Sequence, residues 1–379
     1  MGDFGLLSKL LLISGLFGTA GSLGFQLMAQ RDLPALFAEG RYRNGLIALC
    51  KAITVTTTSA FLISAFSLLN IPVLGVSGFL FCCSIVHGWS QQVFMLAVID
   101  TRSRLEMMRY AKQVLFKTVV ASFVAGGIAA LGGGPLGIIF AELFVTLLLS
   151  MRLIAAITRN VERRFLWKIS VRSFKGNDFS TALTLFLSTL LMFFSTNIDR
   201  WLAADRLTHD DFGLYSFAWI SLTAALSFQA LLNAGIFPLI SKRRKEGHAK
   251  AAFRTTAYIS VATLIVGAVV SVMVYLFAQW FLPNLYQRYA PALPLIMPLL
   301  FAAVLRLSDF WSSYLIVMHR QNLLMKIQVF LILIPCFYYF ATGHSSVFTP
   351  MDFAWLAVLL AAGNYILNAL AAVSNKNEA

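Results

Sequence analysis

The chain has 379 residues, of which 59% are hydrophobic and 12% charged, and its mean hydropathy is +0.78. This composition excludes a soluble globular protein and predicts a membrane protein that crosses the bilayer several times. The net charge of +14 does not indicate nucleic-acid binding, because the basic residues stand in short loops between apolar segments.

Eleven apolar segments are long enough to cross a bilayer, which takes about 20 residues of helix. In chain order they cover residues 5–28, 46–69, 73–98, 112–132, 134–156, 179–199, 212–240, 255–279, 293–318, 323–342 and 352–373. The predicted fold class is therefore all-α, a polytopic integral membrane protein with about 11 transmembrane helices.

The loops between these segments differ sharply in charge. On one side, the loops and the C-terminal tail carry 23 Lys and Arg, and on the other they carry only Arg200, Arg206 and Arg288. By the positive-inside rule, the C-terminus is expected in the cytoplasm and the N-terminus on the outer side of the membrane.

A repeated motif indicates that one structural unit is used twice. Asp3-Phe4-Gly5-Leu6-Leu7-Ser8 recurs as Asp211-Phe212-Gly213-Leu214-Tyr215-Ser216, at an offset of 208 residues, and Glu39-Gly40 recurs as Glu246-Gly247 at 207. Because both motif helices are expected to run in the same direction, the halves are predicted to be parallel repeats related by an axis along the membrane normal.

The repeat predicts an N-terminal bundle of five spans over residues 1–158 and a C-terminal bundle of six spans over residues 179–379. The span at 179–199 has no counterpart in the first half, so the natural plan is expected to be six plus six, with the first helix absent here. Residues 159–178 join the bundles, either as a basic amphipathic segment on the inner membrane surface or as an ordinary basic linker.

Charged residues inside a span are functional candidates, because each costs about 3 kcal/mol or more in the bilayer. Arg306 stands near the middle of its predicted span, and Asp309 follows at i+3, so the two are expected to neutralise one another or to face a hydrated cavity. Glu142 and His87 are candidates for a proton relay, although for His87 we favour a hydrogen-bonded contact between helices.

Five further charged residues lie nearer the ends of their spans: Lys9, Lys51, Lys117, Asp199 and Arg200. Side chains in such positions are equally consistent with reaching the membrane interface and with function.

The sequence contains no catalytic constellation. The outer loops are short, no Gly-rich phosphate loop with Lys-Ser/Thr is present, and the four cysteines lack Cys-x-x-Cys spacing. We therefore expect a secondary transporter rather than an enzyme, with no metal and no cofactor.

Three stretches resemble a known family. Ser195-Thr196-Asn197-Ile198-Asp199-Arg200, then Phe212-Gly213-Leu214-Tyr215-Ser216, then Phe237-Pro238 resemble the second half of Wzx-type polysaccharide flippases of the multidrug/oligosaccharidyl-lipid/polysaccharide flippase superfamily. The resemblance implies two six-helix bundles around a central cavity. It also implies transfer of undecaprenyl-diphosphate-linked oligosaccharide to the outer leaflet of the bacterial inner membrane, for surface polysaccharide such as O-antigen lipopolysaccharide. Membrane lipids, a polysaccharide polymerase and a chain-length regulator are the further expected partners.

For such a substrate, Arg306 is the first candidate for a diphosphate contact, because its planar guanidinium binds phosphate oxygens in pairs. Secondary candidates are Lys51, Lys117, Lys9 and Arg200. Asp309 is expected to orient Arg306, and Glu142 and Asp199 are the further candidates for ion or proton coupling and for orienting the cations.

Three alternatives remain open at this stage. A multidrug and toxic compound extrusion antiporter would be expected to favour acidic cavity residues, whereas the charges within the spans here are mostly basic. A peptidoglycan-precursor flippase usually has additional spans. A non-transporting scaffold of a polysaccharide assembly complex belongs to a different class, and transport by the purified chain would exclude it.

Overall fold

The computed structural model describes residues 2–67, 73–104, 106–159, 168, 176–245, 249–342 and 348–376. The fold is 91% helical, and the described residues form no strand beyond a single bridge between Val73 and Val76. Eleven helices of the described chain are long and apolar enough to cross a membrane, which confirms the predicted all-α multi-pass fold. The predicted linker lies almost wholly outside the described residues, as does the second Glu-Gly pair.

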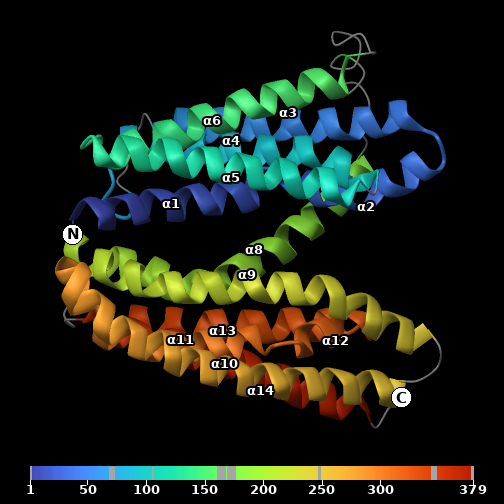
Figure 1. Cartoon of the computed structure of the whole chain (residues 1–379). Coiled ribbons are helices and arrows are strands. Elements are labelled where there is room, and N and C mark those ends of the chain that lie inside the picture. The colour runs from blue at the N-terminus through green and yellow to red at the C-terminus, as the bar shows by residue number, and fades with distance from the viewer. Residues whose placement is uncertain are drawn as a thin grey trace. The chain divides into compact units, whose positions relative to one another are not determined.

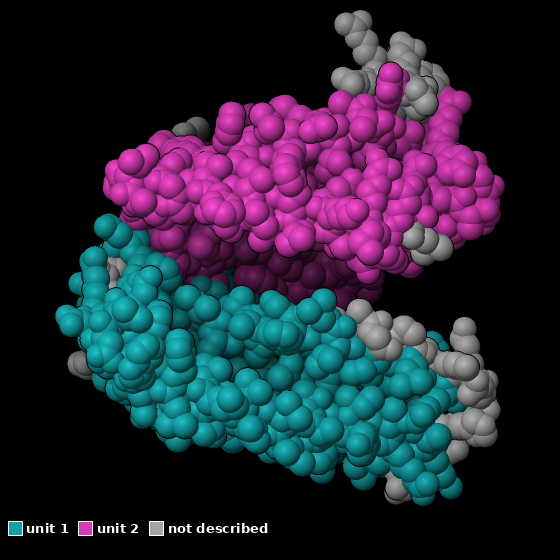
Figure 2. Space-filling model, in the orientation of Figure 1, with its two compact units in different colours: residues 1–5, 194–379 teal, residues 6–193 magenta. Residues whose placement is uncertain are grey.

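The chain divides into two compact units, coloured separately in Figure 2. The N-terminal unit comprises residues 6–193, and the C-terminal unit comprises residues 1–5 and 194–379. The repeat assigns residues 1–158 to the N-terminal bundle. In the structure, the first five of these residues belong to the C-terminal unit. Helix α8 (Gly176–Arg206) contributes its first half to the N-terminal unit and its second half to the C-terminal unit.

The N-terminal unit is a bundle around α4 (Gly78–Ser103), which packs against α3 (Tyr42–Ser67), α5 (Met107–Ala130) and α6 (Gly134–Ile157) (Figure 1). Helices α1 (Gly2–Ala20) and α2 (Phe25–Ala38) complete it together with the start of α8. Its core joins residues of α2, α3, α4 and α8, among them Phe25, Leu33, Leu49, Leu96, Ile99 and Ala182. The long apolar runs therefore bury one face of each helix against its neighbours.

The first predicted span, residues 5–28, is wrong as a single helix. Helix α1 ends at Ala20 and α2 begins at Phe25, because Leu23 (φ 47°) and Gly24 (φ 83°) adopt left-handed backbone conformations that a helix cannot continue. A Cβ atom on Gly24 would lie 1.9 Å from the carbonyl oxygen of Ala182 in α8. The glycine thus provides both the turn and the close approach to α8.

The C-terminal unit is organised around α11 (Leu293–Leu307), which packs against α9 (His209–Lys245), α10 (Ala249–Leu285) and α14 (Pro350–Lys376). A short 3-10 helix, η1 (Gln287–Ala292), precedes α11, and α12 (Trp311–Val317) and α13 (Gln321–Thr342) follow it. The second half of α8 belongs to the same unit.

The predicted span 293–318 is also interrupted, between α11 and α12 at residues 308–310. The break leaves backbone carbonyls outside the regular helix, and these must find partners because no water is available in a bilayer core. Ser260 Oγ donates to the carbonyl of Ser308 over 2.8 Å, and Gln229 Nε2 donates to that of Asp309 over 3.1 Å. Polar side chains of α10 and α9 therefore support the break.

The two copies of the repeated motif begin corresponding helices, and the first residues of the first copy meet the second copy within the C-terminal unit. Asp3 lies in the first turn of α1 and Asp211 in that of α9. A Cβ atom on Gly5 would lie 1.8 Å from the carbonyl oxygen of His209 and 3.2 Å from the backbone nitrogen of Gly213. Glycine in the first copy is thus explained by the close approach of two helix starts.

Candidate functional site

Arg306 is buried near the C-terminal end of α11, with only 7% of its surface exposed. Its Nη1 donates to the carbonyl oxygen of Thr196 in α8 over 3.0 Å, and its Nε has no partner among the described residues. A guanidinium has five N–H donors. Within the described part of the chain, most of the donors of this buried cation are therefore not used by a protein acceptor.

A second group of charges lies on α8 itself. Asp199 is fully buried, and its Oδ2 accepts hydrogen bonds from the Tyr215 hydroxyl over 2.5 Å and from Trp219 Nε1 over 2.9 Å. The guanidinium carbon of Arg200 lies 4.4 Å from the centroid of the Trp219 ring, which is cation–π geometry. Trp219 in α9 thus contacts both charged residues.

Three of the predicted site residues therefore come together around α8: Arg306, Asp199 and Arg200. Thr196, the partner of Arg306, precedes Asp199 by three residues and so lies one turn away on the same helix face. One buried cation, Arg306, and one half-buried cation, Arg200, accompany one carboxylate, whose Oδ1 has no partner in the described chain. This group, which we call the α8 cluster, carries a net positive charge suited to an anionic ligand.

Asp309 forms no ion pair with Arg306 among the described residues, so the first of the two expected arrangements, direct neutralisation, is not observed. Its Oδ2 accepts hydrogen bonds from Asn364 Nδ2 over 2.8 Å and from Asn368 Nδ2 over 3.2 Å, both on α14. The i, i+3 prediction fails because α11 ends at Leu307, so that Asp309 lies in the break rather than on the helix face of Arg306. Asp309 therefore acts on Arg306 through a Coulombic interaction, with no hydrogen bond or ion pair between the two side chains in the described chain.

In the N-terminal unit, a polar chain connects α1, α4, α5 and α6. His87 Nδ1 lies 2.8 Å from Ser14 Oγ, and its Nε2 lies 3.0 Å from Glu142 Oε2 and 3.2 Å from Gln91 Nε2. Lys117 Nζ donates to Gln91 Oε1. We call these five residues the His87 cluster. His87 is 3% exposed, whereas the side chain of Glu142 is 31% exposed.

The His87 cluster has the geometry to hold a proton. One proton must lie between His87 Nε2 and Glu142 Oε2 for their 3.0 Å contact to be a hydrogen bond, on either atom. Of these two side chains, Glu142 is the more exposed and His87 the buried one. The expected contact of His87 between helices is confirmed, since Ser14 belongs to α1 and Glu142 to α6.

The remaining two predicted cations are also buried in the N-terminal unit. Lys9, in α1, is 4% exposed and donates to the carbonyl of Leu74 over 3.2 Å. Lys51, in α3, is 9% exposed. With the half-buried Lys117, three predicted cations of this unit therefore lie on three different helices.

Sequence reasoning that considered only charged groups missed several polar residues. Asn364 and Asn368 stand at i, i+4 within an apolar span, and Gln91 follows His87 at the same spacing, so a search for in-span amides on one helix face would have found them. The sequence around Trp219 contains no comparable pattern that would have identified this residue as part of the site. The described residues contain no group of three or more His, Cys, Asp or Glu that could hold a metal ion.

Comparison with known proteins gives a family over most of the chain. The sequence profile of a family described as polysaccharide biosynthesis protein matches residues 3–291. A search of curated proteins finds no match.

Solved structures resemble the whole chain. An inward-facing multidrug resistance MATE family transporter of the MOP superfamily is 13% identical with a TM-score of 0.67, covering 100% of this chain and 94% of that one. The lipid II flippase MurJ in an inward closed conformation is 11% identical with a TM-score of 0.60, covering 97% of this chain and 87% of that one. At these identities the likeness establishes the fold.

Proposed function

Because the chain belongs to the polysaccharide biosynthesis protein family and has the fold of MOP-superfamily transporters, we propose that this multi-pass membrane protein is a flippase for undecaprenyl-diphosphate-linked oligosaccharide. It would move this lipid from the inner to the outer leaflet by alternating access, supplying surface polysaccharide synthesis. One structural neighbour is a lipid II flippase, which supports a lipid-linked substrate.

The α8 cluster is the observation that carries the proposal. A diphosphate that crosses the hydrocarbon core of a bilayer loses its hydrating water, and cationic groups are needed to take the place of that water. Arg306 keeps most of its donors uncommitted at a buried position, and Arg200 adds a second cation on the adjacent helix. The planar guanidinium of arginine can form bidentate hydrogen bonds with phosphate oxygens. We therefore assign the diphosphate contact first to Arg306.

The other predicted residues receive supporting roles in this proposal. Lys51, Lys117 and Lys9 supply further cations for the anionic substrate, and Asp199 orients Arg200 through the Trp219 ring that they share. Glu142 takes up and releases the coupling proton together with His87. Asp309 stabilises the break that follows Arg306, through Asn364 and Asn368.

We further propose a location and partners. The asymmetry of Lys and Arg favours a C-terminus in the cytoplasm and a place in the bacterial cytoplasmic membrane. A polysaccharide polymerase and a chain-length regulator would use the exported lipid on the other side.

Deletion of the gene in its host tests the proposed function. We expect lipid-linked oligosaccharide to accumulate with its sugar inaccessible from outside, and surface polysaccharide to fall. The intact chain should restore both quantities, whereas Arg306→Ala should restore neither. A deletion strain with wild-type levels of lipid-linked oligosaccharide would overturn the proposal.

The TM-score of 0.67 with a multidrug resistance transporter favours a second candidate, an antiporter for organic cations. Its signature would be a deletion strain that becomes sensitive to toxic organic cations while its surface polysaccharide is unchanged. The net positive charge of the α8 cluster argues against a cationic substrate.

A further inference from the structure

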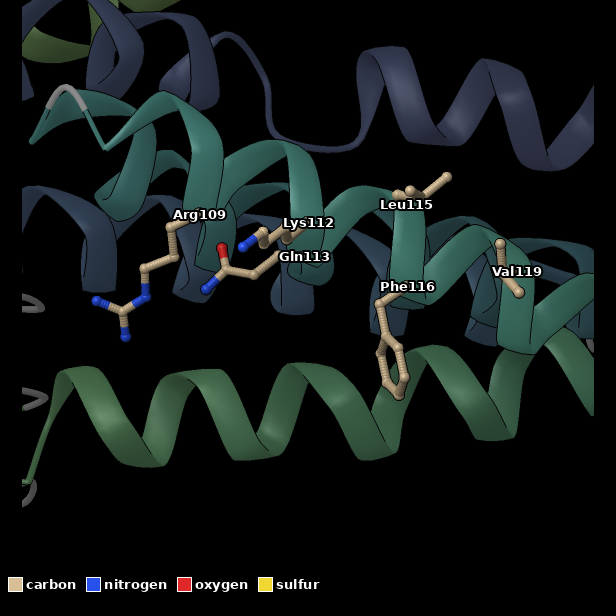
Figure 3. A pocket seen from close by; sticks show the side chains of 6 residues that line it. All are labelled: Arg109, Lys112, Gln113, Leu115, Phe116 and Val119. Atoms are coloured by element: carbon tan, nitrogen blue, oxygen red, sulfur yellow. The ribbon is translucent and has the colours of Figure 1, made fainter.

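A shallow, open groove of about 590 Å³ lies along the exposed face of α5 in the N-terminal unit, separate from the His87 cluster. Figure 3 shows the side chains that line it, on successive turns of this one helix: Arg109, Lys112, Gln113, Leu115, Phe116 and Val119. The polar three stand first along the chain and the apolar three follow. The groove therefore has a cationic end and a hydrocarbon end.

The dimensions of this groove match one leaflet of a bilayer. Arg109 is the third residue of α5, and Val119 follows ten residues later, about 15 Å along the axis at 1.5 Å per residue. That distance is half of a hydrocarbon core of about 30 Å. Leu115 is 64% exposed and Phe116 57% exposed, so the apolar end offers an open surface to a hydrocarbon chain.

The charge at the polar end matches a single negative charge. Arg109 forms an exposed ion pair with Glu106 at 2.9 Å, whereas Lys112 has no hydrogen bond or ion pair with any other described residue. The groove is lined by two cations, and with Glu106, which pairs with Arg109 beside the groove, one net positive charge remains. The guanidinium, the ammonium and the Gln113 amide all supply N–H donors, which phosphate oxygens accept.

We propose that this groove is a binding site for an anionic phospholipid, with the phosphodiester at Arg109 and Lys112 and an acyl chain along Leu115, Phe116 and Val119. The single net charge fits a phosphodiester rather than the more highly charged diphosphate of a lipid-linked sugar. Zwitterionic lipids fit less well, because their own cationic head groups are repelled by the uncommitted ammonium of Lys112. The site is independent of the proposed transport function.

Native mass spectrometry of the purified full chain in detergent tests this site. The probes are phosphatidylglycerol and phosphatidylcholine with identical acyl chains, added at equal concentrations. We expect the wild-type chain to retain phosphatidylglycerol preferentially. Lys112→Gln and Arg109→Gln should each weaken its binding about tenfold, as expected for loss of one charge-assisted hydrogen bond.

Two further variants serve as controls. Lys112→Arg keeps the cation and should retain the lipid, and Lys326→Gln removes an exposed lysine of α13 and should bind as the wild type does. Equal retention of both lipids by the wild type, or unchanged phosphatidylglycerol binding in Lys112→Gln and Arg109→Gln, would overturn the proposal. Displacement of bound phosphatidylglycerol by inorganic phosphate would do so too, because the apolar end would then contribute nothing.

Discussion

Arg306 donates a hydrogen bond over 3.0 Å to the backbone carbonyl of Thr196, 110 residues earlier in the chain. This contact joins α11 to α8 and holds the guanidinium beside the helix that carries Asp199 and Arg200. A substitution that keeps the helix but removes the guanidinium tests what this cation does.

Arg306→Ala should lower export of surface polysaccharide by about ten- to a hundredfold, because it removes one or more charge-assisted hydrogen bonds to the substrate. Arg306→Lys keeps the charge without the fork and should retain part of the export. Export is measured as surface polysaccharide, and membrane content of the protein by immunoblot. Arg288→Ala, at an exposed arginine, is the matched control and should export normally. Normal export by Arg306→Ala at wild-type abundance would remove this residue from the site.

Tyr215→Phe should destabilise the C-terminal unit by about 1–3 kcal/mol, because it takes one of two hydrogen bonds from the buried carboxylate Oδ2 of Asp199. The measurement is the free energy of unfolding, or the midpoint of thermal unfolding, in detergent. Tyr314→Phe is the control: this tyrosine is equally buried, and its hydroxyl has no hydrogen bond in the described chain. Equal effects of the two substitutions would show that the bond to Asp199 contributes little.

Gly5→Ala should also destabilise the protein, by about 1–3 kcal/mol, because the added Cβ would lie 1.8 Å from the carbonyl oxygen of His209. Gly18→Ala lies on the same helix with nothing within 4 Å of its Cβ. That control should leave stability unchanged or raise it by up to about 1 kcal/mol through helix propensity. The measurement is the midpoint of thermal unfolding of the two variants under the same conditions. A Gly5→Ala variant as stable as Gly18→Ala would contradict the close approach of the repeated motifs.

The eleven spans could be predicted from sequence because an apolar run of about 20 residues is a local property. The breaks at residues 21–24 and 308–310 could not, since they depend on the approach of Ala182 to Gly24 and on the donors Ser260 and Gln229. These contacts join residues far apart in the chain.

The candidate charges were likewise visible in the sequence, but their partners were not. Arg306 binds a backbone carbonyl, a group that every residue carries and that leaves no mark in the sequence. Asp309 binds Asn368, 59 residues later, rather than its neighbour at i−3, because the helix ends between the two charges. The sequence therefore shows which charged residues lie within membrane spans, whereas the packing of the helices decides what each charged side chain contacts.

Glu142→Gln should uncouple transport from a proton gradient. The glutamine can still accept a hydrogen bond from His87 Nε2–H at the position of the present 3.0 Å contact, but it cannot take up a proton. In liposomes containing the purified chain, transport of lipid-linked oligosaccharide by the wild type should increase when a pH gradient is imposed. Transport by Glu142→Gln should not respond to the gradient, and His87→Asn should behave in the same way. Glu39→Gln, at an exposed glutamate, should respond as the wild type does. Transport that follows the gradient in both Glu142→Gln and His87→Asn would place the coupling proton elsewhere in the chain.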